Sequence, residues 1–98
     1  MNVIKRKTLI EYGRKFGDAK DQLDTWYHET DKAQWSGPQD VKSRYPSVSF
    51  LHNNIVIFNI KGNRYRLVVK VDYQSQAVFV KWFGSHADYD KQNFQVQS

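Results

Sequence analysis

The pattern of apolar and polar residues changes its period at Val48. Before this residue, apolar side chains recur every three or four positions, which is typical of helices that bury one face. After it, they follow the alternating or continuous patterns of strands. The chain is therefore predicted to be an α+β domain, with helices in its first half and most of its sheet in the second.

The first half predicts one short strand and two helices. Residues 2–5 fit a strand, and Thr8 and Glu11 form a capping-box pattern at the start of a first helix. Gly17 suits the end of that helix, and Asp18 is expected to cap the second. The apolar face of the second helix comprises Ala19, Leu23, Trp26, Tyr27, Thr30 and Ala33. We expect this face to pack against the sheet.

The second half predicts a β-meander. Pro38 suits the first position of one short helical turn, which must end before Pro46 because the residue preceding a proline avoids helical geometry. Strands are then predicted at residues 55–60, 64–73 and 77–83, joined by tight turns. The expected fold is two N-terminal helices packed on a small antiparallel sheet, in the order βααβββ, with the first strand at the sheet edge.

Composition limits the class of protein. The 98 residues are expected to form a single domain, 1–98, and an apolar content of 40% is sufficient for a folded core. The absence of cysteine excludes disulfides and thiolate metal sites, and it favours the cytoplasm. The N-terminus lacks the apolar core of a signal peptide, and no stretch approaches the length of a membrane span. We therefore expect a soluble cytoplasmic protein without a membrane partner.

The charge is unevenly distributed. The net charge of the chain is +5, yet residues 17–40 carry six acidic residues and two lysines. Residues 41–86 carry seven Lys or Arg and one acidic residue. The basic segment coincides with the predicted sheet, which indicates a surface suited to a polyanion such as RNA, whereas the alternative is an ordinary solvated basic face.

The residues around the last predicted strand have the chemistry needed to cleave RNA. Such cleavage can use the 2′-hydroxyl of the RNA as the nucleophile, so the protein must supply a base, an acid and a cation for the pentavalent phosphorus. His86 can exchange a proton near neutral pH, and Arg66 can bind two phosphate oxygens. Tyr89 lies three residues after His86, so that one helical turn would place both on the same side. By strand alternation, Arg64, Arg66 and Lys70 are expected to share one sheet face.

Structural roles compete with these assignments. A single histidine is more often a surface residue than a catalytic one, and His28 and His52 are expected to be of that kind. Tyr89 is also consistent with a cover over the core, and Asp88 or Asp90 with a cap of the C-terminal turn. The three histidines are scattered and no carboxylates have ligand spacing, so no metal site is predicted.

Two segments of the second half resemble a known family. Residues 61–69 (KGNRYRLVV) and 82–90 (WFGSHADYD) are similar to motifs in the HigB branch of the RelE-like toxins, the mRNA-cleaving components of type II toxin–antitoxin systems. The resemblance extends over nearly the whole chain. It implies a βααβββ fold and cleavage of mRNA without a metal or other cofactor, typically in the ribosomal A site. It also implies catalytic roles for Arg66 and His86, with Tyr89 close to the scissile phosphate.

The same resemblance implies a HigA-like antitoxin with a helix-turn-helix DNA-binding domain as the protein partner. The expected RNA-binding residues are Arg64, Lys70, Lys81 and Lys61. One alternative is a non-catalytic RNA- or ribosome-binding module, in which Phe79 and Trp82 stack on bases. Tyr65 is a third such aromatic residue, although alternation points it toward the helices. Another alternative is an interaction protein whose acidic helical half binds a basic partner.

Overall fold

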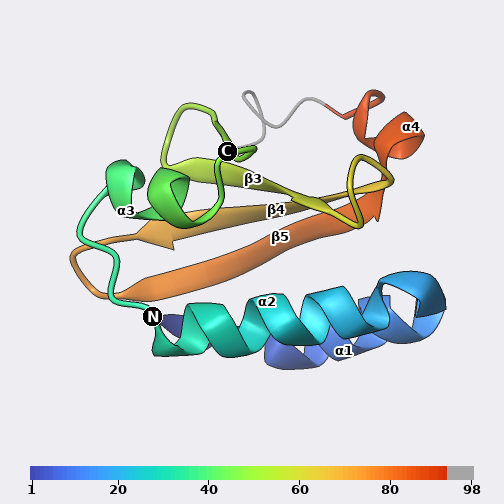
Figure 1. Cartoon of the computed structure of the whole chain (residues 1–98), viewed down its shortest axis with the longest axis horizontal. Helices are drawn as coiled ribbons and strands as arrows, with labels where there is room; N and C mark the ends of the chain where they lie inside the picture. Colours follow the sequence, from blue (N-terminus) through green and yellow to red (C-terminus); the bar gives the residue numbers. More distant parts are fainter. Residues whose placement is uncertain (93–98) are drawn as a thin grey trace.

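The computed structural model describes residues 1–92, in which two long helices cover one face of a five-stranded sheet (Figure 1). The first half contains β1 (Asn2–Ile4), α1 (Arg6–Lys15), the 3₁₀ turn η1 (Gly17–Ala19), α2 (Lys20–Lys32) and α3 (Pro38–Arg44). The second half contains β2 (Ser49–Phe50), β3 (Ile55–Ile60), β4 (Tyr65–Asp72), β5 (Ala77–Ser85) and α4 (His86–Tyr89). The α+β class predicted from the sequence is confirmed. No helix in this part of the chain is long and apolar enough to cross a membrane.

The sheet is mixed. Its strand order is β1-β5-β4-β3-β2, so the first strand joins the edge, as predicted. β2 to β5 pair antiparallel, but β1 runs parallel to β5, and the prediction of a wholly antiparallel sheet was wrong. Antiparallel neighbours are favoured where a tight turn joins them, and no such turn joins β1 to β5 because the helices α1 to α3 and the strands β2 to β4 lie between them.

The predicted starts of the first two helices were wrong. α1 begins at Arg6 after Lys5, which has a left-handed backbone (φ 70°). Thr8 therefore lies within the first turn, where its N–H donates to the Lys5 carbonyl at 3.0 Å, and it does not act as a cap. Asp18 lies in η1, and its carboxylate accepts hydrogen bonds from the β3–β4 hairpin instead of capping α2.

The predicted apolar face of the second helix is confirmed. Leu23, Trp26 and Thr30 are buried, and the Trp26 ring lies edge-on to Phe58 of β3, with ring centroids 5.4 Å apart. Pro38 is the first residue of α3, and β3 has the predicted bounds. β5 continues two residues beyond its predicted end, since Gly84 and Ser85 still pair with β4.

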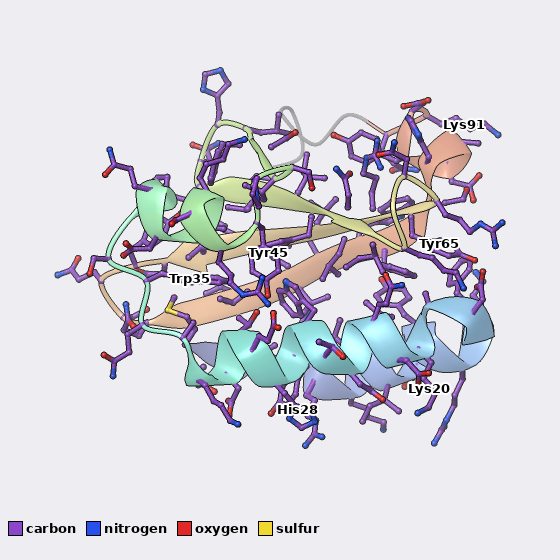
Figure 2. The ribbon with its side chains drawn as sticks, viewed as in Figure 1. Lys20, His28, Trp35, Tyr45, Tyr65 and Lys91 are labelled. Atoms are coloured by element: carbon purple, nitrogen blue, oxygen red, sulfur yellow. The ribbon has the colours of Figure 1, made fainter. Side chains whose placement is uncertain are left out.

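β4 separates two apolar clusters. Tyr65 and Leu67 point toward the helices and join the main core, and Figure 2 shows Tyr65 between the sheet and the helices. On the other face lies a smaller cluster formed by Ile55, Ile57 and Val68 and covered by Leu51, Trp82 and Tyr89. We call this side of the sheet the open face. In Figure 1, α4 lies on it at the end of β5, across the sheet from α1 and α2.

β5 contains a bulge at Lys81. Val68 of β4 pairs with Trp82, whereas Val69 pairs with Val80, so Lys81 has no opposite residue. Before the bulge, Val80 packs into the main core; after it, Trp82 joins the cluster of the open face. Compared with a strand that alternates without interruption, the bulge therefore places the residues after Lys81 on the opposite faces.

Candidate functional site

Arg66 lies on the open face, between Asn59 of β3 and Gly84 of β5. The strand pairing fixes its backbone on both sides, and its side chain is partly buried. Its Nη1 nitrogen is buried and has no hydrogen-bond partner among residues 1–92. A buried guanidinium nitrogen without an acceptor is costly in a folded protein. This geometry suits a group that receives an anionic oxygen from a ligand.

Tyr89 brings an aromatic ring next to Arg66. The Arg66 Cζ atom lies 6.0 Å from the centroid of the Tyr89 ring, and the Trp82 ring centroid lies 6.2 Å from it. Burial raises the pKa of the Tyr89 hydroxyl above its ordinary value, while the nearby Arg66 charge opposes the increase. The phenol therefore keeps its proton at neutral pH and can donate it. Tyr89 also covers the apolar cluster of the open face. A structural role as a cover is therefore observed, and its role in catalysis stays a prediction.

The absence of a side chain at Gly84 leaves room for the ring of Trp82. A Cβ atom at position 84 would lie 2.7 Å from the Cη2 and Cζ2 atoms of the Trp82 ring, closer than real side chains approach. The indole therefore lies over the backbone of Gly84, the residue that pairs with Arg66. The predicted strand, residues 77–83, ended just before Gly84, so sequence reasoning missed this close approach, although a glycine inside a strand is a recognised signal of one.

His86 is the first residue of α4. Its backbone N–H donates to the Arg64 carbonyl at 3.0 Å, and its Nε2 lies 3.5 Å from Asp90 Oδ1. The side chain is 47% exposed, so the imidazole is accessible to a ligand. Ser85 caps the helix, because its Oγ accepts the N–H of Asp88 at 3.1 Å. The structure thus fixes the backbone of His86 and leaves its ring exposed.

The predicted cations fall into two groups. Lys70 is on the same face as Arg66, in a row with Ile55 and Phe79, and Lys81 is exposed at the bulge. These two therefore border the open face that carries Arg66.

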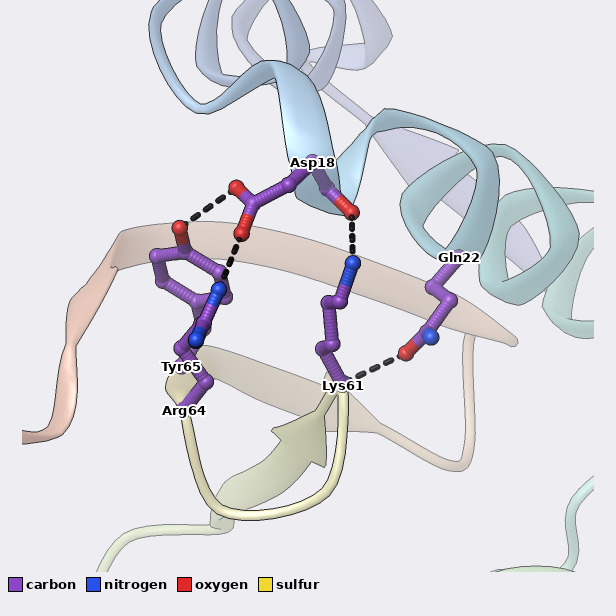
Figure 3. A network of polar contacts seen from close by, with 5 residues as sticks. All are labelled: Asp18, Gln22, Lys61, Arg64 and Tyr65. Carbon is purple, nitrogen blue, oxygen red and sulfur yellow. Dashed lines mark hydrogen bonds and ion pairs between the residues drawn. The ribbon is translucent and has the colours of Figure 1, made fainter.

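The side chains of Arg64 and Lys61 are directed toward Asp18 of η1, away from the open face. Arg64 Nη1 donates to Asp18 Oδ2 at 2.8 Å, and Lys61 Nζ donates to the Asp18 carbonyl at 3.1 Å (Figure 3). The expectation that Arg64 shares a face with Arg66 was wrong, because Arg64 lies in the turn before β4 begins and strand alternation does not apply there.

The other histidines lie apart from this site. His28 is exposed on the side of α2 that points away from the sheet (Figure 2), and His52 is exposed in the loop before β3. Within residues 1–92, no three His, Cys, Asp or Glu side chains are grouped so as to hold a metal ion. The site that the structure assembles is therefore Arg66, Tyr89 and Trp82 on the open face, with His86 at the adjoining helix start.

Comparison with known proteins relates this chain to a family of toxins. The sequence matches the HigB toxin family, described as the RelE-like toxic component of a toxin-antitoxin system, over residues 19–92. The mRNA interferase HigB of Escherichia coli O6:H1 is 24% identical over 93 residues, covering 93% of this chain and 90% of that protein. The mRNA interferase toxin HigB of Escherichia coli K12 is 28% identical over 93 residues, covering 92% and 88%. The matched range, residues 19–92, contains the positions of Arg66, His86 and Tyr89.

Proposed function

Because the chain belongs to the HigB family of RelE-like toxins, the toxic components of toxin–antitoxin systems, we propose that it is an endoribonuclease that cleaves mRNA. Relatives named mRNA interferases align with nearly its whole length, which supports this activity. The observation that carries the proposal is the buried Nη1 of Arg66, which has no hydrogen-bond partner among residues 1–92 and lies beside the ring of Tyr89. An mRNA-cleaving toxin of this kind stops translation and growth.

In the proposed reaction, the 2′-hydroxyl oxygen of the RNA attacks the adjacent phosphorus. The bond from phosphorus to the 5′-oxygen breaks, which leaves a 2′,3′-cyclic phosphate and a 5′-hydroxyl. Arg66 stabilises the charge that develops on the phosphoryl oxygens, a contribution of about 3 kcal/mol for a well-placed donor. Because the nucleophile belongs to the substrate, this chemistry needs no metal ion.

Two protons must move in this reaction, and His86 and Tyr89 are the proposed groups. His86 has an accessible imidazole, which suits removal of the proton from the 2′-hydroxyl. A tyrosine hydroxyl carries its proton at neutral pH, and burial raises the pKa of Tyr89 further, so Tyr89 is the proposed group that donates a proton toward the leaving 5′-oxygen. Lys70 and Lys81 are proposed to bind neighbouring phosphates along the open face.

The family relationship also supports a wider proposal. We propose that the topology is RelE-like, that cleavage occurs in the cytoplasm on mRNA in the ribosomal A site, and that a HigA-like helix-turn-helix antitoxin inhibits the toxin. Lys61 and Arg64 already contact Asp18, so they are weaker candidates for RNA contacts than Lys70 and Lys81.

Brief induction followed by mapping of mRNA 5′ ends tests the proposal. The parent protein should arrest growth and create new 5′ ends within coding regions, and Arg66→Ala should create few. Unchanged growth and unchanged 5′ ends, with folded protein present, would contradict the proposal. RNA or ribosome retention without new ends would instead favour the non-catalytic binding module.

A further inference from the structure

The turn between β3 and β4, residues 61–64, is held from two sides. On one side it contacts Asp18 of η1 and Gln22 of α2, whose Oε1 accepts the backbone N–H of Lys61 (Figure 3). On the other side, the Arg64 carbonyl accepts the N–H of His86 at 3.0 Å. The turn thus connects the junction of α1 and α2 to the first residue of α4.

Asp18 supplies most of the contacts on the helix side. Its carboxylate accepts from Tyr65 Oη at 2.5 Å and from Arg64 Nη1 at 2.8 Å, and its carbonyl accepts from Lys61 Nζ at 3.1 Å. Figure 3 shows these bonds reaching both ends of the turn from one residue. Hydrogen bonds to a carboxylate are stronger than those between neutral groups. Asp18 therefore fixes both the beginning and the end of the turn.

Within the turn, one backbone hydrogen bond, from the Arg64 N–H to the Lys61 carbonyl at 3.2 Å, closes residues 61–64. Residues 61–64 are all exposed, and none belongs to either apolar cluster. Lys61 and Gly62 have left-handed backbones, with φ of 55° and 64°, a conformation that is unfavourable for a residue with a side chain such as lysine. The position of the Arg64 carbonyl therefore depends on contacts from outside the turn as well as on this bond and on the strand pairing of Tyr65.

We propose that Asp18 is a positioning residue for RNA cleavage, because it fixes the turn whose Arg64 carbonyl holds the backbone of His86. This inference rests on the role of His86 proposed above. The same turn leads directly into β4, on which Arg66 follows Arg64 by two residues. Asp18 thus acts on the start of α4 and on the entry of β4 without touching the RNA.

The effect of removing Asp18 should be local. The side chains of Arg64 and Asp18 are 62% and 35% exposed, and ion pairs this exposed contribute little to global stability. The Tyr65 ring remains packed between Phe16 and Phe83 whether or not its hydroxyl is bonded. A loss of activity in an Asp18 variant would therefore arise mainly from displacement of the turn and of the His86 backbone, which the Arg64 carbonyl of the turn holds.

Amide hydrogen exchange and cleavage kinetics of Asp18→Ala, Asp18→Asn and His86→Ala test the inference. In Asp18→Ala, the His86 amide should exchange about fivefold faster, whereas that of Val69 in the main core should be unchanged. The kcat should fall about tenfold, with KM within about twofold of the parent. Asp18→Asn keeps the acceptor oxygen without the charge and should be intermediate; it also replaces the alanine variant if that protein does not fold. Asp24→Ala is the matched control, because it breaks an exposed ion pair between Asp24 and Lys20 on α2, away from the turn. This variant should behave as the parent.

The outcomes separate this inference from the proposed function. Parental exchange at His86 in Asp18→Ala, or equal acceleration at His86 and Val69, would overturn the positioning role alone. Faster exchange at His86 with parental kcat, while His86→Ala is inactive, would also overturn it. Parental cleavage by His86→Ala would overturn the assignment of His86, and the inference would fall with it. Faster exchange at His86 together with reduced kcat and unchanged KM is the expected result.

Discussion

The ring of Trp82 occupies the space above Gly84 that a side chain at position 84 would need. The same ring contacts Tyr89, which in turn lies against the guanidinium of Arg66. The side chains of Trp82, Tyr89 and Arg66 are therefore arranged on the open face around Gly84, which has no side chain. The first prediction follows from this dependence.

Gly84→Ala should displace the Trp82 ring, because the new Cβ would lie 2.7 Å from it. We expect a loss of about 1–3 kcal/mol in the free energy of unfolding, as for other overpacked sites, and a decrease in cleavage. Urea denaturation and a cleavage assay would measure both. Gly17→Ala is the control, since among the described residues a Cβ at position 17 would meet no atom within 4 Å apart from its chain neighbours. Similar values for the two variants would show that Trp82 adjusts without cost.

Arg66→Ala should reduce cleavage about a hundredfold, as expected for the loss of about 3 kcal/mol of transition-state stabilisation. Arg66→Lys should recover little, because an ammonium cannot bind two phosphoryl oxygens in the way that a planar guanidinium does. The melting temperature should change little, since Nη1 has no protein partner to lose within the described residues. Equal losses of activity and melting temperature would make Arg66 a structural residue.

His86→Ala should give a folded protein that binds RNA or ribosomes but no longer cleaves. The imidazole is 47% exposed and its contact with Asp90 is at the surface, so removing it should leave the core intact. Binding should persist through Arg66, Lys70 and Lys81 and should weaken with salt. The assay compares melting temperature, salt-dependent retention and cleavage, with His28→Ala as the control on the outer side of α2. Cleavage within about threefold of the parent would transfer the proton-transfer role to another group.

Asp18 should make stability depend on pH in acid. The hydrogen bond from Tyr65 and the contact with Arg64 lower the pKa of Asp18 in the folded state. The unfolded chain then binds its proton first as pH falls, so the stabilisation is complete above about pH 5 and is lost below about pH 4. Because the Asp18 contacts are largely exposed, urea denaturation of parent and Asp18→Asn should show only a small stability difference at pH 6, and this difference should shrink at pH 3. Tyr65→Phe should reduce this pH dependence, and an identical profile would contradict the assigned cause.

The ends of the RNA products should carry a 5′-hydroxyl and a 2′,3′-cyclic or 3′-phosphate. This follows from attack by the 2′-hydroxyl, so a substrate with a 2′-deoxynucleotide at the cleavage position should not be cut. Labelling of the products by a polynucleotide kinase without prior phosphatase treatment would detect the 5′-hydroxyl. A short RNA cleaved by excess protein should still be cut in the presence of a chelator. Products with 5′-phosphates that form only with magnesium would refute the mechanism.

The periodicity of the sequence was sufficient to predict the main layers but not the helix starts. The apolar faces of α2 and β3 were predicted because burial of many side chains imposes a regular spacing. Thr8 and Asp18 were misassigned because a capping residue depends on a few local bonds, and for Asp18 the hairpin supplies better partners, Tyr65 and Arg64, from far along the chain.

The candidate site was predicted in its residues but not in its arrangement. Arg66, His86 and Tyr89 were identified by chemical type and by family motif, yet their assignment to catalysis stays a prediction. The position of Trp82 on the open face, where it contacts Tyr89, could not be foreseen because it depends on the bulge at Lys81. The close approach of Trp82 to Gly84 did have a signal, a glycine next to the end of a strand, which was missed. The direction of Arg64 depends on the turn that precedes β4, which alternation does not describe.

The bulge at position 81 makes the pairing of β5 with β4 part of what determines the site. Val80 and Phe83 both point into the main core although they are three positions apart, which is possible in a strand only when one residue is added between them. Deleting Lys81 would make Val80 and Trp82 consecutive residues of a regular strand and would leave both on their present faces. Keeping Lys81 without the bulge would instead exchange the two faces for the last residues of the strand, sending Trp82 toward the helices and Phe83 toward the open face. The bulge between Val80 and Trp82 therefore matters as much for this site as the identity of the side chains that form it.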